Sequence, residues 1–310
     1  MQHPLSTTSA VLAAVTVVTL AVSPAVAGQT AAPKPTSTAT GAWTAPRTPW
    51  GDPDIQGIWS NASTVPDAQP NRPRGSETGG PEHWYEARPI VFTAELPIVD
   101  PPDGKVPELL PSAAERAAAL NKLRRRRTEA PQDRSPWDRC ITRGVPGSMI
   151  PINYNNNYQF LQSPGYVVIL YEMIHDARII PIGRPHLTGN IRQWMGDARG
   201  RWEGRTLVVE TTNFTDKSQV IYGDGFHTQR LRITERFTPV DADTLQYQFT
   251  VEDPETWTKS WTAAIPLKRE RGQHVILEYA CHEGNYAMSN ILSGARAEER
   301  EEKAGKAEDR

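Results

Sequence analysis

The chain lacks the short motifs that would name a reaction. It contains no G-x-S-x-G nucleophile elbow, no P-loop and no G-x-G-x-x-G dinucleotide fingerprint. It also has no H-E-x-x-H and no C-x-x-C pair, two common spacings of zinc ligands. We therefore expect no cofactor and no metal, and a candidate site has to be found from the pattern of individual side chains.

The chain also lacks a strong charge of either sign. Its formal net charge is -2, whereas a nucleic-acid-binding protein would show a basic field, so we expect no nucleic-acid partner. The one basic cluster, Arg124–Arg127, has another explanation. Ser112 and Glu115 form an S-x-x-E capping box, which predicts a helix over residues 112–127. The arginines then fall at the C-terminus of that helix, where its dipole favours cations.

Charged residues are missing from the first 27 positions. An apolar run from Ala10 to Val22 ends there in an A-x-A pattern at 25–27, and it is shorter than the roughly 20 apolar residues of a transmembrane helix. This predicts a signal peptide over residues 1–27 and an exported protein, periplasmic or secreted, with no integral membrane segment in the mature chain. Residues 28–50, rich in Pro, Thr, Ala and Gly, are expected to form a flexible linker.

Cysteine is scarce, with Cys140 and Cys281 as the two examples. In an exported protein such a pair predicts a disulfide bond. Two unpaired buried thiols, or one reactive thiol beside His282, are the alternatives.

Short strands dominate the second half of the chain. From Leu245 to Val251 apolar and polar residues alternate strictly, which is the pattern of a strand with one buried face. Further strands are expected at Val167–Leu170, Leu207–Val209 and Ile276–Tyr279. Because turn residues separate them with little helix between, we predict a mainly β protein, an antiparallel meander forming a barrel or curled sheet.

The remaining segments set the domain organisation. Residues 51–296 are expected to form a single β-rich domain whose first strand lies within 54–60. Residues 61–110 are dense in Pro, Gly and charge, which predicts an extended wrap over the surface. Its anchors are expected to be Trp84, Tyr85 and Phe92. The charged tail 297–310 predicts a solvated helix with no binding role.

A carboxylate occupies an apolar face in the segment 231–237. Glu235 shares its strand parity with Leu231, Ile233 and Phe237. An unpaired buried charge is very costly. Glu235 is therefore an acid or base with a raised pKa, the partner of a nearby arginine at the barrel mouth, or a residue that a local bulge turns outward.

A second ionisable group follows an apolar strand. It contains Glu172, His175, Asp176 and Arg178. If the strand continues from Val168, Glu172 and Asp176 face one side and His175 the other. A carboxylate near an imidazole suits general acid–base chemistry, although His175 fits a structural role equally well.

A third group comprises Cys281, His282 and Glu283. We count His282 and Glu283 among the candidate acids and bases. With His175 and His186 they could be assembled into a metal site, since imidazole and carboxylate ligands suit zinc or iron. Adjacent strand residues point to opposite faces, which counts against a Cys281–His282 catalytic pair.

Polar and aromatic residues supply candidate ligand contacts. The run Tyr154–Tyr158 places three amides between two tyrosines, and it either forms a turn or lines a polar pocket. Tryptophans near strands either fill the core or stack against a sugar or aromatic ligand. The ligand-binding candidates are Arg143, Tyr154, Asn155, Asn156, Asn157, Arg178, Trp194 and Trp202.

Several segments together resemble a family of exported bacterial proteins with no established reaction. They are NNNYQ, EMIHDARIIP, IRQWMGDARGRWEGRTLVVETTNF, ERFTPVDADTLQYQFTVEDPETW and EYACHEGNY, within about residues 137–296. The resemblance implies export and assigns no catalytic role. Gly57-Ile58-Trp59 also resembles the G-x-W entry strand of lipocalin-like barrels, although the Pro-rich wrap departs from that pattern.

Three function hypotheses remain open. The first is an acid–base enzyme of the lyase, isomerase or hydrolase type on a small hydroxylated or aromatic substrate, with Arg143 and Arg178 as anion partners. The second is a lipocalin-like carrier with a wide lumen and no catalysis. The third is an envelope or interaction protein that acts through its surface. The sequence does not set the oligomeric state.

Overall fold

The computed structural model describes residues 43–61, 97–124, 127–152, 154–220, 227–272 and 275–308. The chain divides into two compact units, Met1–Ala42 and Trp43–Arg310, and every described residue belongs to the second. The expected signal peptide and the residues Trp84, Tyr85 and Phe92 lie outside the described ranges.

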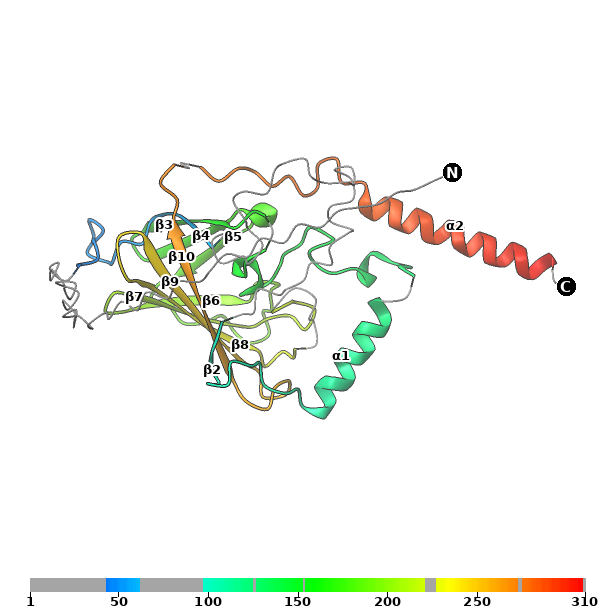
Figure 1. Cartoon of the computed structure of the whole chain (residues 1–310), viewed down its shortest axis with the longest axis horizontal. Coiled ribbons are helices and arrows are strands. Elements are labelled where there is room, and N and C mark those ends of the chain that lie inside the picture. The colour runs from blue at the N-terminus through cyan, green and yellow to red at the C-terminus, as the bar shows by residue number, and fades with distance from the viewer. Residues whose placement is uncertain are drawn as a thin grey trace, which may run out of the picture. The chain divides into compact units, whose positions relative to one another are not determined.

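The second unit is built around an antiparallel β-barrel (Figure 1). Its hydrogen-bonded strand order is β5-β4-β3-β1-β10-β9-β8-β7-β6, and the short β2 pairs with β10 off this path. The strands are β1 Gly57–Ser60, β2 Ile98–Asp100, β3 Asn157–Ser163, β4 Tyr166–Tyr171, β5 Ala177–Pro181, β6 Asp197–Glu203, β7 Thr206–Thr212, β8 Arg232–Pro239, β9 Thr244–Glu252 and β10 Trp261–Arg269. The predicted mainly β barrel is confirmed.

The barrel has one seam, between β5 and β6. Nine strands lie on the path, and this odd number leaves its two outer strands parallel, with one backbone bridge, Ile182 to Gly200, between them. Gly200 permits this approach, because a Cβ there would lie 2.5 Å from Ile182 Cδ1 and 3.0 Å from Ile180 Cγ2. We name the two ends of the barrel by their turns: Glu172 follows β4 at one end, and Arg205 lies in the β6–β7 turn at the other.

Side chains fill the interior of the barrel. Inward positions alternate along the strands as the period-two pattern predicts, and they are buried. Phe237 stacks on Tyr247 with ring centroids 4.9 Å apart, and Phe160 packs edge-on against Phe237 at 5.2 Å. Phe249 and Trp261 continue the aromatic column with centroids 5.8 Å apart.

The predicted first strand is confirmed as β1. Gly57 has φ +123°, and Trp59 is 1 % exposed. The indole N–H of Trp59 donates to the Ile55 carbonyl at 2.9 Å, and the Arg269 guanidinium lies 4.1 Å from the ring centroid. This cation–π contact fixes the N-terminal strand against the last one.

Two α-helices accompany the barrel in the described residues, α1 Pro111–Arg124 and α2 Ala287–Glu308. The helix predicted at 112–127 therefore exists, although α1 ends at Arg124 and residue 127 is not helical. The capping box is wrong, because Ser112 is already the second helical residue and proline occupies the first. The helical tail is confirmed, yet it begins at residue 287 and not at 297. No helix in the described ranges is long and apolar enough to cross a membrane.

Three sequence expectations need correction. Ile276–Tyr279 lies outside the sheet, so the strand predicted there is wrong. Residues 43–50, assigned to a flexible linker, are folded onto the next segment, because Arg47 bridges Pro53 and the amide of Asp54 donates to Pro46 O at 2.8 Å. Part of the extended wrap joins the sheet, since β2 pairs with β10.

The disulfide predicted for the two cysteines is present. Cys140 and Cys281 are bonded, with their Cα atoms 5.7 Å apart. The bond ties the residues before α2 to the segment that precedes β3.

The seam yields a first prediction. Gly200→Ala is expected to lower the free energy of unfolding by about 1–3 kcal/mol, because the added methyl group overpacks the contact with Ile180 and Ile182. Ile182→Val in the same background should restore part of the loss. Urea unfolding measures both, and Gly189→Ala, whose added methyl meets nothing within 4 Å, is the control. If Gly200→Ala and Gly189→Ala unfolded with equal free energies, the packing argument would be contradicted.

Candidate functional site

A buried ion pair joins β5 to β8 inside the barrel. Arg178 and Glu235 are 4 % and 0 % exposed, and Arg178 Nη2 donates to Glu235 Oε2 at 2.5 Å. The same nitrogen donates to the Thr211 hydroxyl on β7 at 2.6 Å. The seam separates β5 from the strands β6, β7 and β8 at the other end of the strand path. These side-chain bonds therefore connect the two sides of the seam in the barrel interior. The inward direction expected for Glu235 and its pairing with an arginine both match the structure.

Two tyrosines complete this network. The Tyr247 hydroxyl donates to Glu235 Oε1 at 3.0 Å, and Arg178 Nη1 donates to the Tyr171 hydroxyl at 3.4 Å. Burial raises the pKa of Tyr171 to about 12, against the opposing effect of the Arg178 charge. Burial alone would lower the pKa of Arg178, but Glu235 and Tyr171 outweigh it and the pKa is raised. Since both carboxylate oxygens of Glu235 are engaged, this residue serves barrel closure.

A strained turn connects β4 to β5 at the Glu172 end. The strand stops at Tyr171, and the 3₁₀ turn η4 Met173–His175 follows, so the condition under which Glu172 and Asp176 would face the side opposite His175 is not met. Ile174 has φ 64° and His175 has φ 55°, two consecutive left-handed residues. For a β-branched side chain this conformation is an outlier that costs on the order of 1–3 kcal/mol, and such strain clusters at functional sites.

The turn carries two carboxyl groups. Glu172 is 7 % exposed, and its Oε2 accepts from the Asn157 amide at 3.1 Å. Burial raises the pKa of Glu172, and the Asn157 hydrogen bond opposes it only partly. Burial likewise raises the pKa of Asp176, against hydrogen bonds from Ala177 and Thr142. Both groups therefore keep a proton to higher pH than an exposed carboxyl group.

A buried phenol, Tyr158, lies within electrostatic reach both of Glu172 and of the buried cation Arg143. Arg143 is 2 % exposed, with its guanidinium 5.2 Å from the Trp137 ring centroid. Asn61 Nδ2 donates to the Tyr158 hydroxyl at 2.9 Å. Burial raises the pKa of Tyr158, while Arg143 lowers it and Glu172 raises it further. We call Glu172, Asp176, Arg143 and Tyr158 the rim cluster.

The segment that carries Arg143 is buried from residue 142 to residue 150. Gly144 has φ +81°, and a Cβ there would lie 1.7 Å from the backbone oxygen of Gln219. The Gly147 amide donates to Val220 O at 2.9 Å. Arg143 is therefore held by close backbone packing on the segment before β8.

The asparagine run is a turn. Asn155 has φ 54°, and Asn156 is 5 % exposed with its Oδ1 accepting from the Ile152 amide at 2.9 Å. Tyr154 stacks on Tyr279 with ring centroids 6.5 Å apart. Asn157 begins β3 and holds Glu172 through its amide. The side chains of Asn156 and Tyr154 are thus used for structure.

The three ionisable groups of the sequence meet at one point in the described residues, where Arg178 of the second group binds Glu235 of the first. Glu235 lies inside the barrel, whereas His175 is exposed in the turn at the Glu172 end. His282 and Glu283 are exposed beside the disulfide. Glu235, His175, His282 and Glu283 make no contact with one another in the hydrogen bonds and ion pairs of the described chain.

The two tryptophan candidates serve packing. Trp202 on β6 is half-buried against the core, and Trp194 is half-buried with the Arg139 guanidinium 5.8 Å from its ring centroid. Core filling, one of the two expected roles, describes Trp202.

His186 fastens the connection from β5 to β6. Its Nδ1 lies 2.8 Å from Asp197 Oδ2, and its Nε2 lies 3.3 Å from Glu210 Oε1. Arg199 also pairs with Asp197, at 2.6 Å. These contacts hold the crossing segment 182–196 against β6 and β7. Within the described ranges, no group of three or more His, Cys, Asp or Glu residues is arranged to hold a metal ion.

Sequence reasoning missed Asn61 and Tyr171, and it named Tyr158 only as one end of the asparagine run. The usable signal was strand parity, because Tyr158 alternates with Phe160, and Tyr171 with Ile169, on faces that proved to point inward.

No protein-family model, curated protein or solved structure matches the chain. Its function has to be inferred from the side chains and their geometry.

The ion pair gives a stability prediction. Glu235→Leu is expected to lower the free energy of unfolding by about 3–5 kcal/mol, because it leaves the Arg178 charge buried without a partner. The double variant Arg178→Met/Glu235→Leu should lose less free energy of unfolding than Glu235→Leu alone, since it leaves neither charge of the pair buried. Urea unfolding of both proteins measures this difference. A double variant less stable than Glu235→Leu would contradict the pairing.

The raised pKa of Glu172 predicts a pH dependence. The folded protein keeps this proton above the ordinary value of 4.5, where the unfolded chain has already lost it. Stability should therefore fall as pH rises from 4.5 through the raised pKa, and Glu172→Gln should flatten that part of the curve. Unfolding measured across this range tests it, with the exposed Glu283→Gln as the control. Parallel curves for wild type and Glu172→Gln would refute the shift.

Proposed function

We propose that the protein is an exported acid–base enzyme that acts on a small hydroxylated or aromatic molecule at the Glu172 end of its barrel. Glu172 and Asp176 are the proton-transferring groups, and Arg143 is the partner for developing negative charge. The observation that carries the proposal is the strained turn at Ile174 and His175, which holds two carboxyl groups whose pKa burial raises.

The turn supplies what general acid–base chemistry requires. A carboxyl group whose pKa lies nearer to neutrality can both give and take a proton at working pH. Glu172 keeps one oxygen on the Asn157 amide, which orients the group. Glu235 does not meet this requirement, because Arg178 and Tyr247 occupy both of its oxygens.

Arg143 suits the complementary role. A buried guanidinium in a low-dielectric setting stabilises developing negative charge more than an exposed one does. Arg143 and Glu172 both act electrostatically on Tyr158, so Tyr158 lies between the cation and this carboxyl group in its interactions. The reaction class is elimination, isomerisation or hydrolysis, in which a proton moves and a negative oxygen develops.

The carrier hypothesis finds less support in the described chain. Its wide lumen would have to lie where the aromatic column of Phe160, Phe237, Tyr247 and Phe249 now packs. The interaction-protein hypothesis stays a prediction. The disulfide between Cys140 and Cys281 is compatible with export, because such bonds persist in oxidising compartments.

The enzyme proposal is tested by turnover. Wild-type protein is incubated with a panel of aromatic esters, lactones and β-hydroxy acids, and products are followed by mass spectrometry. Glu172→Gln should lower turnover by about 100-fold or more, since a positioned acid or base contributes about 10²–10⁴-fold. Glu283→Gln is the matched control and should retain activity. A panel without products, or full activity in Glu172→Gln, would reject the proposal.

A further inference from the structure

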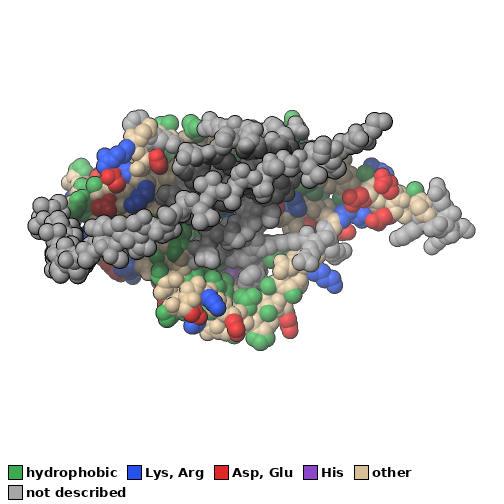
Figure 2. Space-filling view, viewed as in Figure 1, with side chains coloured by type: hydrophobic (Ala, Val, Ile, Leu, Met, Phe, Trp, Pro, Cys, Tyr) green, Lys and Arg blue, Asp and Glu red, His purple; other side chains and the backbone are tan. Residues whose placement is uncertain are grey.

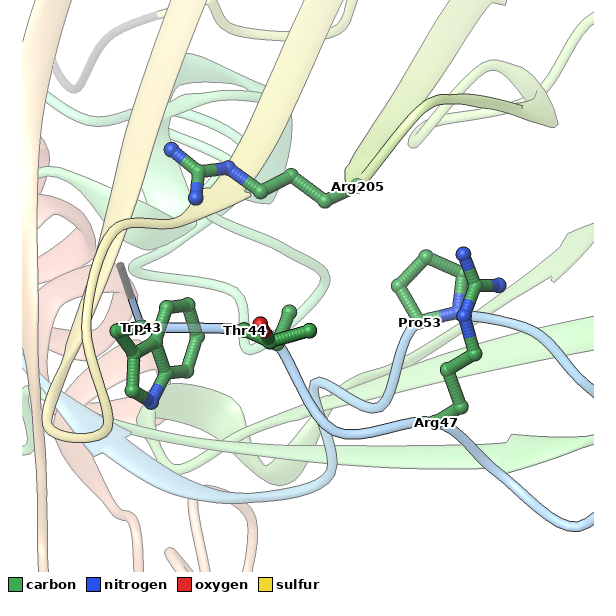
Figure 3. Close-up of a pocket in the computed structure, with 6 residues that line it drawn as sticks. Trp43, Thr44, Arg47, Pro53 and Arg205 are labelled. Carbon is green, nitrogen blue, oxygen red and sulfur yellow. The ribbon is translucent and has the colours of Figure 1, made fainter. Parts of the chain in front are cut away.

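A small cavity lies at the Arg205 end of the barrel, opposite the rim cluster. Its volume is about 200 Å³, and it is lined by Trp43, Thr44, Ala45, Arg47, Pro53 and Arg205 (Figure 3). In Figure 3 Arg205 reaches in from the β6–β7 turn, opposite Trp43 and Thr44, and the Arg47 side chain lies beside Pro53. We propose that this cavity binds a small aromatic carboxylate, with Arg205 on the carboxylate, Trp43 against the ring, and Arg47 adding positive charge to the lining.

The N-terminal wall of the cavity is built and held in place. Arg47 bridges Pro53, and the Thr48 amide donates to Asp52 O at 2.9 Å. Gln162 on β3 then fastens the wall, accepting from the Ile55 amide at 2.8 Å and donating to Pro53 O at 3.0 Å. The cavity is therefore preformed, as small-molecule sites usually are.

The lining carries positive charge without an acidic residue. Arg205 has no hydrogen bond or ion pair with another described residue, and Arg47 donates to the Gly51 carbonyl but to no carboxylate. The acids of this segment are engaged locally, since Asp52 accepts from the Trp50 indole at 3.1 Å and Asp54 from the Gln56 amide at 3.0 Å. Two guanidinium groups without a counter-charge in the lining attract an anion.

The remaining lining selects the kind of anion. A guanidinium presents donors in a planar fork that matches a planar carboxylate in two parallel hydrogen bonds. Trp43 offers a flat indole surface, and Pro53 an apolar wall, to an unsaturated body. The cavity lies below the roughly 300–1,000 Å³ of drug-sized sites, so the ligand is a compact one.

This site is independent of the proposed enzyme site, which lies at the other end of the barrel. It rests on none of the acid–base residues, and Glu172→Gln should leave it intact. Failure of one proposal therefore does not imply failure of the other.

Benzoate binding tests the inference. Isothermal titration calorimetry of the full chain should show benzoate binding at one site. Its affinity should fall about tenfold or more in Arg205→Gln, which removes a charged hydrogen-bond donor, and by less in Arg47→Gln, which removes a charge from the lining. Trp43→Leu should weaken benzoate more than acetate. Arg201→Gln is the matched control, since it removes one charge from the same hairpin but lies outside the cavity lining.

Three outcomes would overturn the proposal. If the calorimetry shows no benzoate binding, the proposed site is excluded. A loss of benzoate affinity in Arg201→Gln equal to that in Arg205→Gln would show that net charge alone attracts the ligand. Inorganic phosphate that binds as well as benzoate excludes the aromatic carboxylate as the preferred class.

Discussion

The bond between Arg178 and Glu235 is the interaction on which the barrel depends. The strand path has an odd number of members, so β5 and β6 meet in parallel with one backbone bridge. Arg178 crosses that seam and donates hydrogen bonds to Thr211 and Glu235. These side-chain bonds join strands between which few backbone hydrogen bonds form. Two buried charges are tolerated because each neutralises the other and Tyr247 satisfies the second carboxylate oxygen.

This closure decides where proton chemistry can occur. A carboxylate that holds the seam has to stay charged and fully bonded, whereas an acid–base catalyst has to exchange its proton. The interior group therefore serves architecture, and the turn at Glu172 and Asp176 keeps carboxyl groups whose pKa burial has raised. On the face shown in Figure 2, the visible acidic and basic side chains of the described residues are intermixed.

Local patterns predicted the fold well because they report strand parity. The alternation at Leu245–Val251 and the inward position of Glu235 follow from the period of a strand alone. The partner of Glu235 could not be predicted, because Arg178 lies 57 residues away and meets it only once the seam closes. The apolar run at Ile276–Tyr279 has strand composition but finds no edge to pair with. The left-handed Ile174 also escaped prediction, since β-branched residues disfavour that conformation.

Strand direction separates the two proposed sites. The chain leaves β4 at the Glu172 end and leaves β6 at the opposite end, so the acidic turn and the turn bearing Arg205 cannot meet. Between them lies a packed aromatic column, which transmits no ligand from one end to the other. A carboxylate bound by Arg205 therefore has no direct contact with the rim cluster. Substitutions can alter the two ends of the barrel one at a time.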